Sequence, residues 1–234
     1  MSVVGKVALI TGATGALGTV VSHRFQEEGA QLVLCDIAEE PLHALGRELG
    51  DPPCLVSRTD VTDAKAIQRL VEKGLEQFGR IDILLNIAGG YRGGRIAELS
   101  EEDLEFALSL NLKSTFLTCR AVAPHMTAQG WGRIVNVGAR AGLGGTAGNA
   151  LHAISKGGVI LLTEALAKEV RDHGVTANVV IPSTLDTPAN REAFPNAEFA
   201  KWVPPEHIAE TMLFICSQEA GSINGARITV FNRT

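Results

Sequence analysis

Short apolar runs alternate with longer stretches of helical periodicity along the whole chain. Seven of these runs are nearly continuous in Val, Ile, Leu and Ala, a pattern typical of strands that are buried on both faces of a sheet. They predict strands at 6–10, 31–35, 53–57, 81–86, 132–137, 175–181 and 226–231. A sheet with one wet face would instead show alternating apolar and polar residues, so we expect this sheet to be covered on both sides.

The segments between these runs carry apolar residues three and four positions apart, as amphipathic helices do. They predict helices at 17–28, 39–49, 64–78, 101–128, 149–173 and 205–216. Regular alternation of strand and helix indicates right-handed βαβ crossovers and a doubly wound parallel sheet. We therefore expect a three-layer α/β Rossmann fold in one domain, residues 1–234, with a seven-stranded, mostly parallel sheet and helices on both faces.

Charge and cysteine content narrow the function classes. The chain has a net charge of −5 and no run of Lys or Arg, so it lacks the basic patch that a DNA-binding regulator needs. The four cysteines lack C-x-x-C spacing, which favours reduced, buried thiols over disulfides or zinc. No stretch is apolar for long enough to suggest a membrane span, and the start MSVVGK does not resemble a signal peptide. We expect a cytoplasmic protein that binds no metal, nucleic acid or membrane.

The first predicted strand runs into TGATGALG, where Gly12, Gly15 and Gly18 lie three apart at the start of a helix. Glycines there let the backbone approach a pyrophosphate closely, and the helix N-terminus offers free N–H groups to the anion. Tight packing alone would also explain them. The second strand ends in Asp36, whose carboxylate can bind the ribose hydroxyls of an adenosine and so favours the coenzyme interpretation. Because no basic residue lies in the turn or in the two positions after Asp36, the sequence favours NAD(H) over NADP(H).

These motifs resemble the short-chain dehydrogenase/reductase family over nearly the full length of the chain. TGATGALG resembles its T-G-x-x-x-G-x-G turn, and the segment NIAG resembles its N-N-A-G segment with Ile87 as a departure. PSTLDT resembles its P-G-x-x-x-T segment, with Ser183 in place of the glycine. The resemblance implies a nicotinamide coenzyme held mostly at strand ends. The residues it implies for this coenzyme are Gly12, Thr14, Gly15, Leu17, Gly18, Asp36, Ile37, Asp60, Val61, Asn86, Ala88, Gly89, Lys156, Pro182, Thr184 and Thr187.

The resemblance also implies which residues would be catalytic. Asn111 corresponds to a helix asparagine that holds a water in a proton relay. Lys156 corresponds to the lysine of Y-x-x-x-K, which binds the nicotinamide ribose and lowers the pKa of the tyrosine. Two departures stand out: the tyrosine position holds His152, and the position of the family's serine, thirteen residues earlier, holds Ala139.

A narrower resemblance is to the dihydropteridine reductases. It is carried by AGGYRGG, GARAGLGGTAG and PSTLDTPANREAFPNAEFAKWVP. Those enzymes also have alanine at the position of Ala139, prefer NADH, and keep an aromatic residue at the position of Tyr91, so Tyr91 and Ala139 are candidate substrate contacts. They retain the tyrosine that His152 replaces here, and Asn111 follows the broader family instead.

His152 and Lys156 lie four positions apart, which places them on one face of the predicted helix. An imidazole can transfer protons near neutral pH, where its ordinary pKa of about 6.5 lies. It is shorter than a phenol, so a water would have to bridge it to the substrate, and the Lys156 ammonium lowers its pKa. A proton-transfer role and a space-filling role for His152 are both compatible with the sequence.

Other polar and aromatic residues have simpler interpretations. Arg92 and Arg95 could meet an anionic substrate, but solvated loop charges are the favoured interpretation. Trp202 is expected to pack a short helix of the substrate loop. Ser100 is a good N-cap, and the acidic run 101–103 after it suits the start of a helix.

Two functions fit this sequence. The first is an NAD(H)-dependent oxidoreductase acting on a small carbonyl or quinonoid, pterin-like substrate, for which His152 with Asn111 and water would move the proton. The second is an NAD(H)-binding homologue with little or no turnover, a sensor or a non-catalytic subunit. The family resemblance further implies a homotetramer or homodimer that associates through the helices at 101–128 and 149–173.

Overall fold

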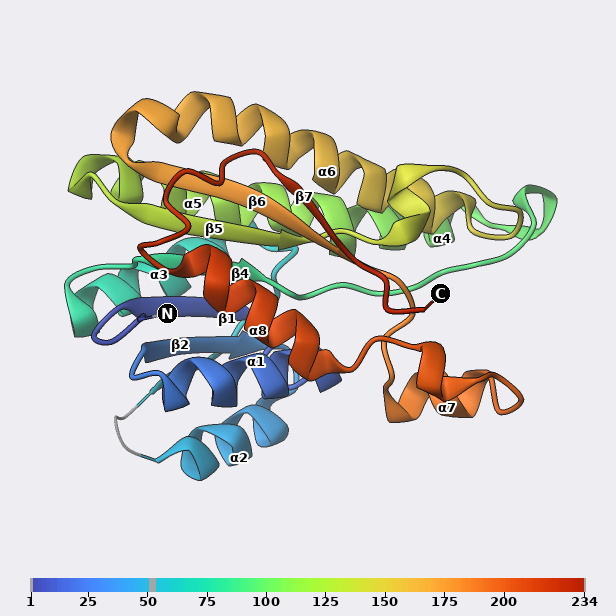
Figure 1. The fold of residues 1–234 in the computed structure, drawn as a ribbon, viewed down its shortest axis with the longest axis horizontal. Coiled ribbons are helices and arrows are strands. Elements are labelled where there is room, and N and C mark those ends of the chain that lie inside the picture. Colours follow the sequence, from blue (N-terminus) through green and yellow to red (C-terminus); the bar gives the residue numbers. More distant parts are fainter. Residues whose placement is uncertain (1, 51–53, 234) are drawn as a thin grey trace.

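A seven-stranded sheet of parallel strands forms the centre of the computed structural model, which describes residues 2–50 and 54–233 (Figure 1). The strands are β1 Val7–Thr11, β2 Gln31–Asp36, β3 Leu55–Arg58, β4 Ile83–Asn86, β5 Gly132–Val137, β6 Val175–Pro182 and β7 Arg227–Val230. Their order in the sheet is β3-β2-β1-β4-β5-β6-β7. The order reverses between β1 and β4, so the two halves of the sheet meet at the carboxyl ends of these strands, where such folds bind ligands.

Helices cover both faces of the sheet, as the uninterrupted apolar strands predict (Figure 1). The α-helices are α1 Ala16–Glu27, α2 Glu39–Leu49, α3 Ala64–Phe78, α4 Glu101–Ala107, α5 Ser114–Gln129, α6 Ala150–Val170, α7 Pro188–Ala193 and α8 Pro205–Cys216. Apolar side chains of α1, α2 and α8 pack on one face, and those of α3, α5 and α6 pack on the other.

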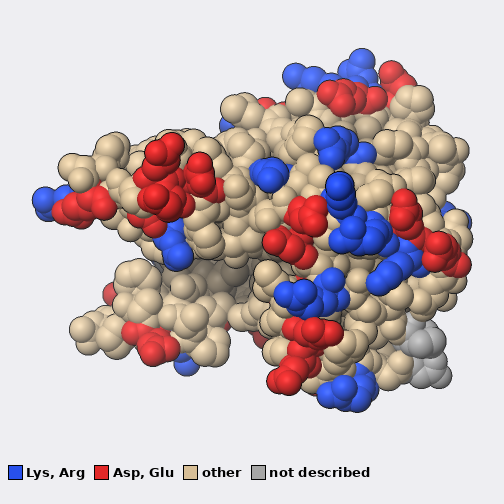
Figure 2. All heavy atoms as spheres, turned by 180° about the vertical axis from the view of Figure 1, so that it is seen from behind, with Lys and Arg blue, Asp and Glu red and all other residues tan. Residues whose placement is uncertain are grey.

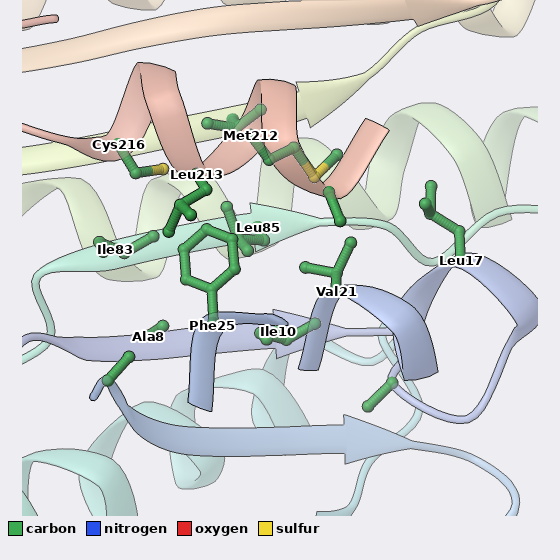
Figure 3. Close-up of a cluster of buried hydrophobic side chains, with 14 of the residues drawn as sticks. Ala8, Ile10, Leu17, Val21, Phe25, Ile83, Leu85, Met212, Leu213 and Cys216 are labelled. Carbon is green, nitrogen blue, oxygen red and sulfur yellow. The ribbon is translucent and has the colours of Figure 1, made fainter. Parts of the chain in front are cut away.

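Two large apolar clusters, one on each face of the sheet, and a third, smaller one hold the layers of the described chain together. In Figure 3, Phe25 of α1 and Met212 of α8 lie over the strands β1 and β4. Ile10 of β1 belongs to this cluster, whereas its neighbour Leu9 belongs to the cluster on the opposite face. This alternation follows from the two-residue period of a strand. Because both faces are buried, the polar groups of the strands are exposed mainly at the strand ends.

The predicted elements agree closely with the observed ones. The helices expected at 39–49, 64–78 and 205–216 and the strand at 132–137 have the expected bounds. The start of the third predicted strand, residue 53, lies outside the described residues. The short helix α7 lies in the substrate loop expected between the sixth strand and the helix at 205–216, and all strand pairs are parallel.

The helix expected at 101–128 is not continuous. A π-helical segment, Leu108–Lys113, separates α4 from α5. Hydroxyl groups just after it donate to carbonyls one turn back: Ser114 to Leu110 at 2.5 Å and Thr115 to Asn111 at 2.8 Å. Such bonds compete with the regular backbone ladder and help to distort it. Single-turn π segments are frequent at functional sites, and this one contains Asn111.

One expectation about membranes was too strict. The helical segment Ala150–His173 is long and apolar enough to cross a bilayer by length and composition, with a mean hydropathy of 1.3. It is α6 with the following 3-10 turn, and it contributes Val159, Ile160, Ala167 and Val170 to the apolar clusters beside the sheet. Burial against the sheet therefore explains part of its apolar character, while Ile154 and Leu161 on the same helix are exposed.

The four cysteines are free. Cys35, Cys119 and Cys216 are buried as expected, but Cys54 is only half-buried, at the start of β3. Burial raises the pKa of the Cys119 thiol to about 12 and raises that of Cys35 and Cys216 as well, so these groups stay protonated at neutral pH.

Candidate active site

The turn between β1 and α1 has two glycines that no other residue could replace without movement. Gly12 has φ +67°, and a Cβ there would lie 2.7 Å from Ala88 Cα. A Cβ on Gly18 would lie 2.0 Å from the Gly12 carbonyl oxygen. Gly15 is less restricted, because its Cβ would meet only the same oxygen at 3.4 Å. The second glycine of the T-G-x-x-x-G-x-G motif falls on Ala16, so the match to that motif rests on Gly12 and Gly18.

The start of α1 fits the phosphates of a dinucleotide. Its N-cap, Gly15, makes no side-chain capping bond, and the first turn contains no acidic residue. The free N–H groups and the positive end of the helix dipole are therefore not neutralised within the chain, which favours an anion. A steric cradle with uncompensated donors is what a pyrophosphate requires.

Asp36 closes this turn from the end of β2. Its Oδ2 accepts from the backbone N–H of Thr14 at 3.1 Å, and its Oδ1 accepts from Ile37 at 2.7 Å and Ala38 at 3.2 Å. A carboxylate has about four acceptor positions, so one on Oδ2 remains for a ligand. Ile37 is 58% exposed, and the carboxylate is half-buried beside it. The placement fits the ribose-binding role implied for Asp36.

Asp60 and Val61 follow β3 along the same edge. The Asp60 carboxylate accepts from the backbone N–H of Thr62 at 2.8 Å and from its hydroxyl at 2.7 Å. These bonds lower the pKa of Asp60. The bonds between Asp60 and Thr62 shape the loop that leads to α3, and Val61 between them is buried. The coenzyme contact that the resemblance implies for Asp60 and Val61, at the adenine end, stays a prediction.

The end of β4 is joined to β1 and to a buried polar network. Thr11 accepts hydrogen bonds from the N–H groups of Ile87 at 3.1 Å and Ala88 at 3.2 Å, which fixes the segment that leads to Gly89. The Asn86 side chain points away from this segment and accepts from Thr118 at 2.7 Å. Only the backbone of Asn86 is therefore free to face a coenzyme.

That network continues into the next strand. Asn86 donates to Asn136 of β5 at 2.8 Å, and Asn136 donates to Thr163 of α6 at 2.9 Å. Each of these side chains is buried. The network connects β4, β5, α5 and α6 directly behind the candidate site. Neither Thr118 nor Thr163 has a sequence signal that sets it apart from other helix threonines.

Asn111 is fully buried, and its amide group is bound by protein. Oδ1 accepts from Gly90 N–H at 3.0 Å, and Nδ2 donates to the Gly90 carbonyl at 3.0 Å and to Ser155 Oγ at 3.2 Å. Ser155 in turn donates to the His152 carbonyl at 3.2 Å. The Asn111 side chain therefore holds the loop after β4 against α6, and both of its amide hydrogens are used within the chain. Sequence reasoning overlooked Ser155.

Lys156 lies at the bottom of the site with its ammonium group buried. Nζ donates to the Val137 carbonyl, at the end of β5, over 2.8 Å, and burial lowers the pKa of Lys156 to about 8. A Cβ on Gly89 would lie 3.3 Å from this nitrogen and 2.8 Å from Asn111 Oδ1. A side chain on Gly89 would therefore displace the buried amide group of Asn111 and crowd Lys156.

His152 lies one helical turn before Lys156. Its Nδ1 is among the few buried side-chain polar atoms of the described residues that have no hydrogen-bond partner. Burial, and secondly the charge of Lys156, lower the pKa of His152 to about 4. The imidazole is therefore neutral at pH 7. The Tyr91 ring lies against it with the ring centroids 5.3 Å apart and the planes at 69°.

The segment between β6 and α8 forms the wall of the candidate site that faces the start of α1. Thr187 caps α7 by accepting from Asn190 N–H at 3.2 Å, and the Thr184 carbonyl accepts from Val203 N–H at 2.9 Å. Pro182 ends β6. Between this segment and the start of α1 lies a cavity of about 330 Å³ lined by Ala16 and Thr187 among others. Figure 2 shows the molecule hollowed between the part that carries α4 and the part that carries α7.

The remaining candidates have mainly structural contacts. Arg92 lies 3.6 Å from Asp103 and stacks on Phe106, while Arg95 is exposed. Ala139 follows β5, is half-buried and offers no hydroxyl. Trp202 packs against two phenylalanines of its own loop, as expected.

The start of the helix after Ser100 is also as expected: Ser100 and Asp103 form a capping box. Within the part of the chain that the structure describes, no three His, Cys, Asp or Glu side chains are placed to share a metal ion.

A doubly wound parallel sheet with a glycine turn and a strand-end carboxylate at its switch point defines a dinucleotide-binding α/β protein. Residues 6–198 match the short chain dehydrogenase family. The chain therefore belongs to the short-chain dehydrogenases, oxidoreductases that use nicotinamide coenzymes.

Several curated proteins are similar over nearly their full length. The 3-oxoacyl-[acyl-carrier-protein] reductase FabG of Thermotoga maritima is 35% identical over 240 residues, covering 98% of this chain and 98% of that protein. The (2S)-[(R)-hydroxy(phenyl)methyl]succinyl-CoA dehydrogenase subunit BbsD of Thauera aromatica is 37% identical, with 96% and 94% covered. The D-threitol dehydrogenase of Mycolicibacterium smegmatis is 33% identical, with 97% and 91% covered.

Proposed function

We propose that this chain is an NAD(H)-dependent oxidoreductase that acts on a small carbonyl or quinonoid, pterin-like substrate. The observation that carries the proposal is Asp36, whose carboxylate is bonded to the glycine turn and keeps one acceptor position free. The turn would hold the pyrophosphate, Asp36 the adenosine ribose and Lys156 the nicotinamide ribose. A bound nicotinamide coenzyme supplies or accepts a hydride. The similar proteins are named as reductases and dehydrogenases of carbonyl and hydroxyl compounds, which supports this class of reaction.

The preference for NAD(H) follows from charge. A 2′-phosphate next to the Asp36 carboxylate would meet like charge, and the following residues, Ile37 and Ala38, bring no cation. We expect NADH to bind more tightly than NADPH in a fluorescence titration. Asp36→Asn should reduce this difference by roughly tenfold, since it removes the charge and keeps an acceptor oxygen. Equal affinity of the unaltered protein for both coenzymes would contradict the assignment.

His152 is a poor proton donor in this site, because little of it carries the proton at neutral pH. With a pKa of about 4, roughly one imidazole in a thousand is protonated at pH 7. The neutral ring can still donate a hydrogen bond to a substrate oxygen, as neutral imidazoles do in other enzymes. Substrates whose reduced form is a stabilised anion need no immediate proton, so quinonoid compounds suit this site better than simple ketones.

The test is substrate-dependent oxidation of NADH. We expect loss of NADH absorbance with one or more members of a panel of quinonoid dihydropterins, quinones and diketones. Lack of turnover with the whole panel, while NADH still binds, would favour the alternative below.

The alternative is an NAD(H)-binding homologue that acts as a sensor or non-catalytic subunit. It is favoured by the lowered pKa of His152, which leaves the imidazole neutral where the family has a tyrosine. The variant His152→Tyr separates the two functions. If it gains large activity where the unaltered protein has none, the chain has lost an ancestral activity, and the oxidoreductase proposal is wrong.

A further inference from the structure

The sole tyrosine of the chain, Tyr91, lies on the loop after β4 and contacts the ring of His152. The two rings meet edge to face, with centroids 5.3 Å apart. Edge-to-face pairs of this kind are favoured by the charge distribution of aromatic rings and resist rotation of either ring. Tyr91 is 56% exposed, whereas His152 beside it is half-buried, so Tyr91 lies on the more exposed side of the ring pair.

The hydroxyl of Tyr91 is anchored on the segment that leads into α6. It donates to Asn149 Oδ1 at 2.6 Å, three residues before His152. The same two segments are joined by the backbone, because Gly94 N–H donates to the Gly148 carbonyl at 2.8 Å. Gly93 has to lack a side chain, since a Cβ there would lie 2.1 Å from the Tyr91 hydroxyl. The loop is thus shaped around the tyrosine.

The backbone beside Tyr91 is fixed as well. Both the N–H and the carbonyl of Gly90 are bonded to the Asn111 side chain, which is itself bonded to Ser155 of α6. Tyr91 is therefore held from both ends by groups that are connected to the helix of His152. This arrangement is more than a loop side chain needs for packing alone.

His152 has little else to orient it. Its Nδ1 is buried without a partner, and no hydrogen bond of its other ring nitrogen is seen among the described residues. The titratable groups next to the imidazole are Lys156, one turn along α6, and Tyr91 itself. A ring with one buried nitrogen and no anchoring bond needs a steric partner to hold one orientation.

We infer that Tyr91 is a positioning residue for His152: it holds the imidazole with Nδ1 buried and leaves Nε2 as the nitrogen that can bond a ligand. The geometry does not depend on the activity. Its catalytic consequence rests on the function proposed above, because an oriented Nε2 is useful only when a substrate oxygen lies opposite.

The first test is the titration of His152 by NMR of the imidazole Cε1–H, with His152→Gln to assign the signal. In the unaltered protein we expect a pKa near 4. In Tyr91→Ala the ring regains water, so the pKa should rise toward 6.5 by roughly one unit or more. Tyr91→Phe keeps the ring and should leave the pKa nearly unchanged. Ile96→Ala, on the same loop and 78% exposed, is the matched control. Equal His152 titration in Tyr91→Ala and the unaltered protein would overturn the inference.

A second variant and a second readout complete the test. Asn149→Ala removes the acceptor of the tyrosine hydroxyl, together with the bond from Asn149 Nδ2 to Thr146, and leaves the Tyr91 ring in place. It should shift the titration in the same direction by less, which covers the case in which Tyr91→Ala does not fold. With an active quinonoid substrate, Tyr91→Ala should lower kcat about tenfold with an unchanged KM for NADH, and Tyr91→Phe should restore it. Absence of turnover in the unaltered protein contradicts the proposed function alone, since the titration still decides the role of Tyr91.

Discussion

Lys156 has its charged group in the protein interior with a carbonyl as its hydrogen-bond partner. It is 7% exposed, and its Nζ donates to Val137. Burying an ammonium group without a carboxylate costs free energy, which is the reason for its lowered pKa. Titratable groups with strongly shifted pKa values are frequent at functional sites, and the Lys156 ammonium lies at the end of β5. An anionic or hydroxyl-rich ligand in the site would compensate for it.

The burial of Lys156 predicts a specific pH dependence of stability. Between about 8 and 10.5 the unfolded chain holds a proton that the folded protein has released, so the free energy of unfolding rises with pH in this window. Lys156→Met removes this contribution. The stability of the unaltered protein relative to this variant should therefore increase by about 1 to 3 kcal/mol from pH 7 to pH 10.5 in urea unfolding. The matched control is Lys168→Met, which removes an exposed lysine from the same helix. The pH dependence described above should be lost in Lys156→Met and retained in Lys168→Met.

At the scale of elements, the carboxyl ends of β4 and β5 are tied to α5 and α6 by the chain of buried amides and hydroxyls through Asn86 and Asn136. Removing one member leaves its neighbours buried and unpaired, which is more costly than removing a whole pair.

This comparison can be made with Asn136 and Thr163. Each of the variants Asn136→Ala and Thr163→Val should lower the free energy of unfolding by about 1 to 3 kcal/mol. The double variant should cost less than the sum, because Thr163→Val alone strands the Asn136 amide group. Thr211→Val, which removes an exposed hydroxyl bonded to its own helix, is the control. Strict additivity would show that the network is not a unit.

The sequence predicts elements better than the contacts of polar side chains. The strands and most helix bounds follow from apolar periodicity. The candidate roles of Gly12, Gly18 and Asp36 follow from their places in the turn after the first strand, at the start of the next helix and at the end of the second strand. The π-helical segment was not predicted, because apolar periodicity carries no signal for it and the hydroxyl bonds of Ser114 and Thr115 beside it also occur in regular helices. The partners of Asn111 were also missed, because Gly90 and Ser155 meet it only through tertiary packing.

At the scale of the whole molecule, α5 and α6 present apolar side chains to solvent. Phe116, Ile154 and Leu161 are 45%, 56% and 63% exposed. A groove of about 470 Å³ between the two helices is lined in part by Leu162 and Leu166. Exposed apolar surface of this kind is typical of a subunit interface.

We propose that α5 and α6 form the homo-oligomer interface that the family resemblance implies. The unaltered protein should sediment as a dimer or tetramer. Leu161→Glu should shift it toward the monomer, because a charge in an apolar interface is strongly unfavourable. Val4→Glu, on an apolar residue that is 70% exposed at another part of the surface, should leave the oligomer intact. A monomeric unaltered protein at micromolar concentration contradicts this proposal.

The bond from Thr14 N–H to Asp36 also bears on any attempt to redesign coenzyme choice. In the function proposed above, one carboxylate would both discriminate between the two coenzymes and keep the neighbouring backbone in shape. Exchanging it for a small neutral residue would relax selectivity and loosen the anion cradle together. An engineer who wants NADP(H) here would have to retain an acceptor at residue 36 and introduce the cation beside it, at Ile37 or Ala38.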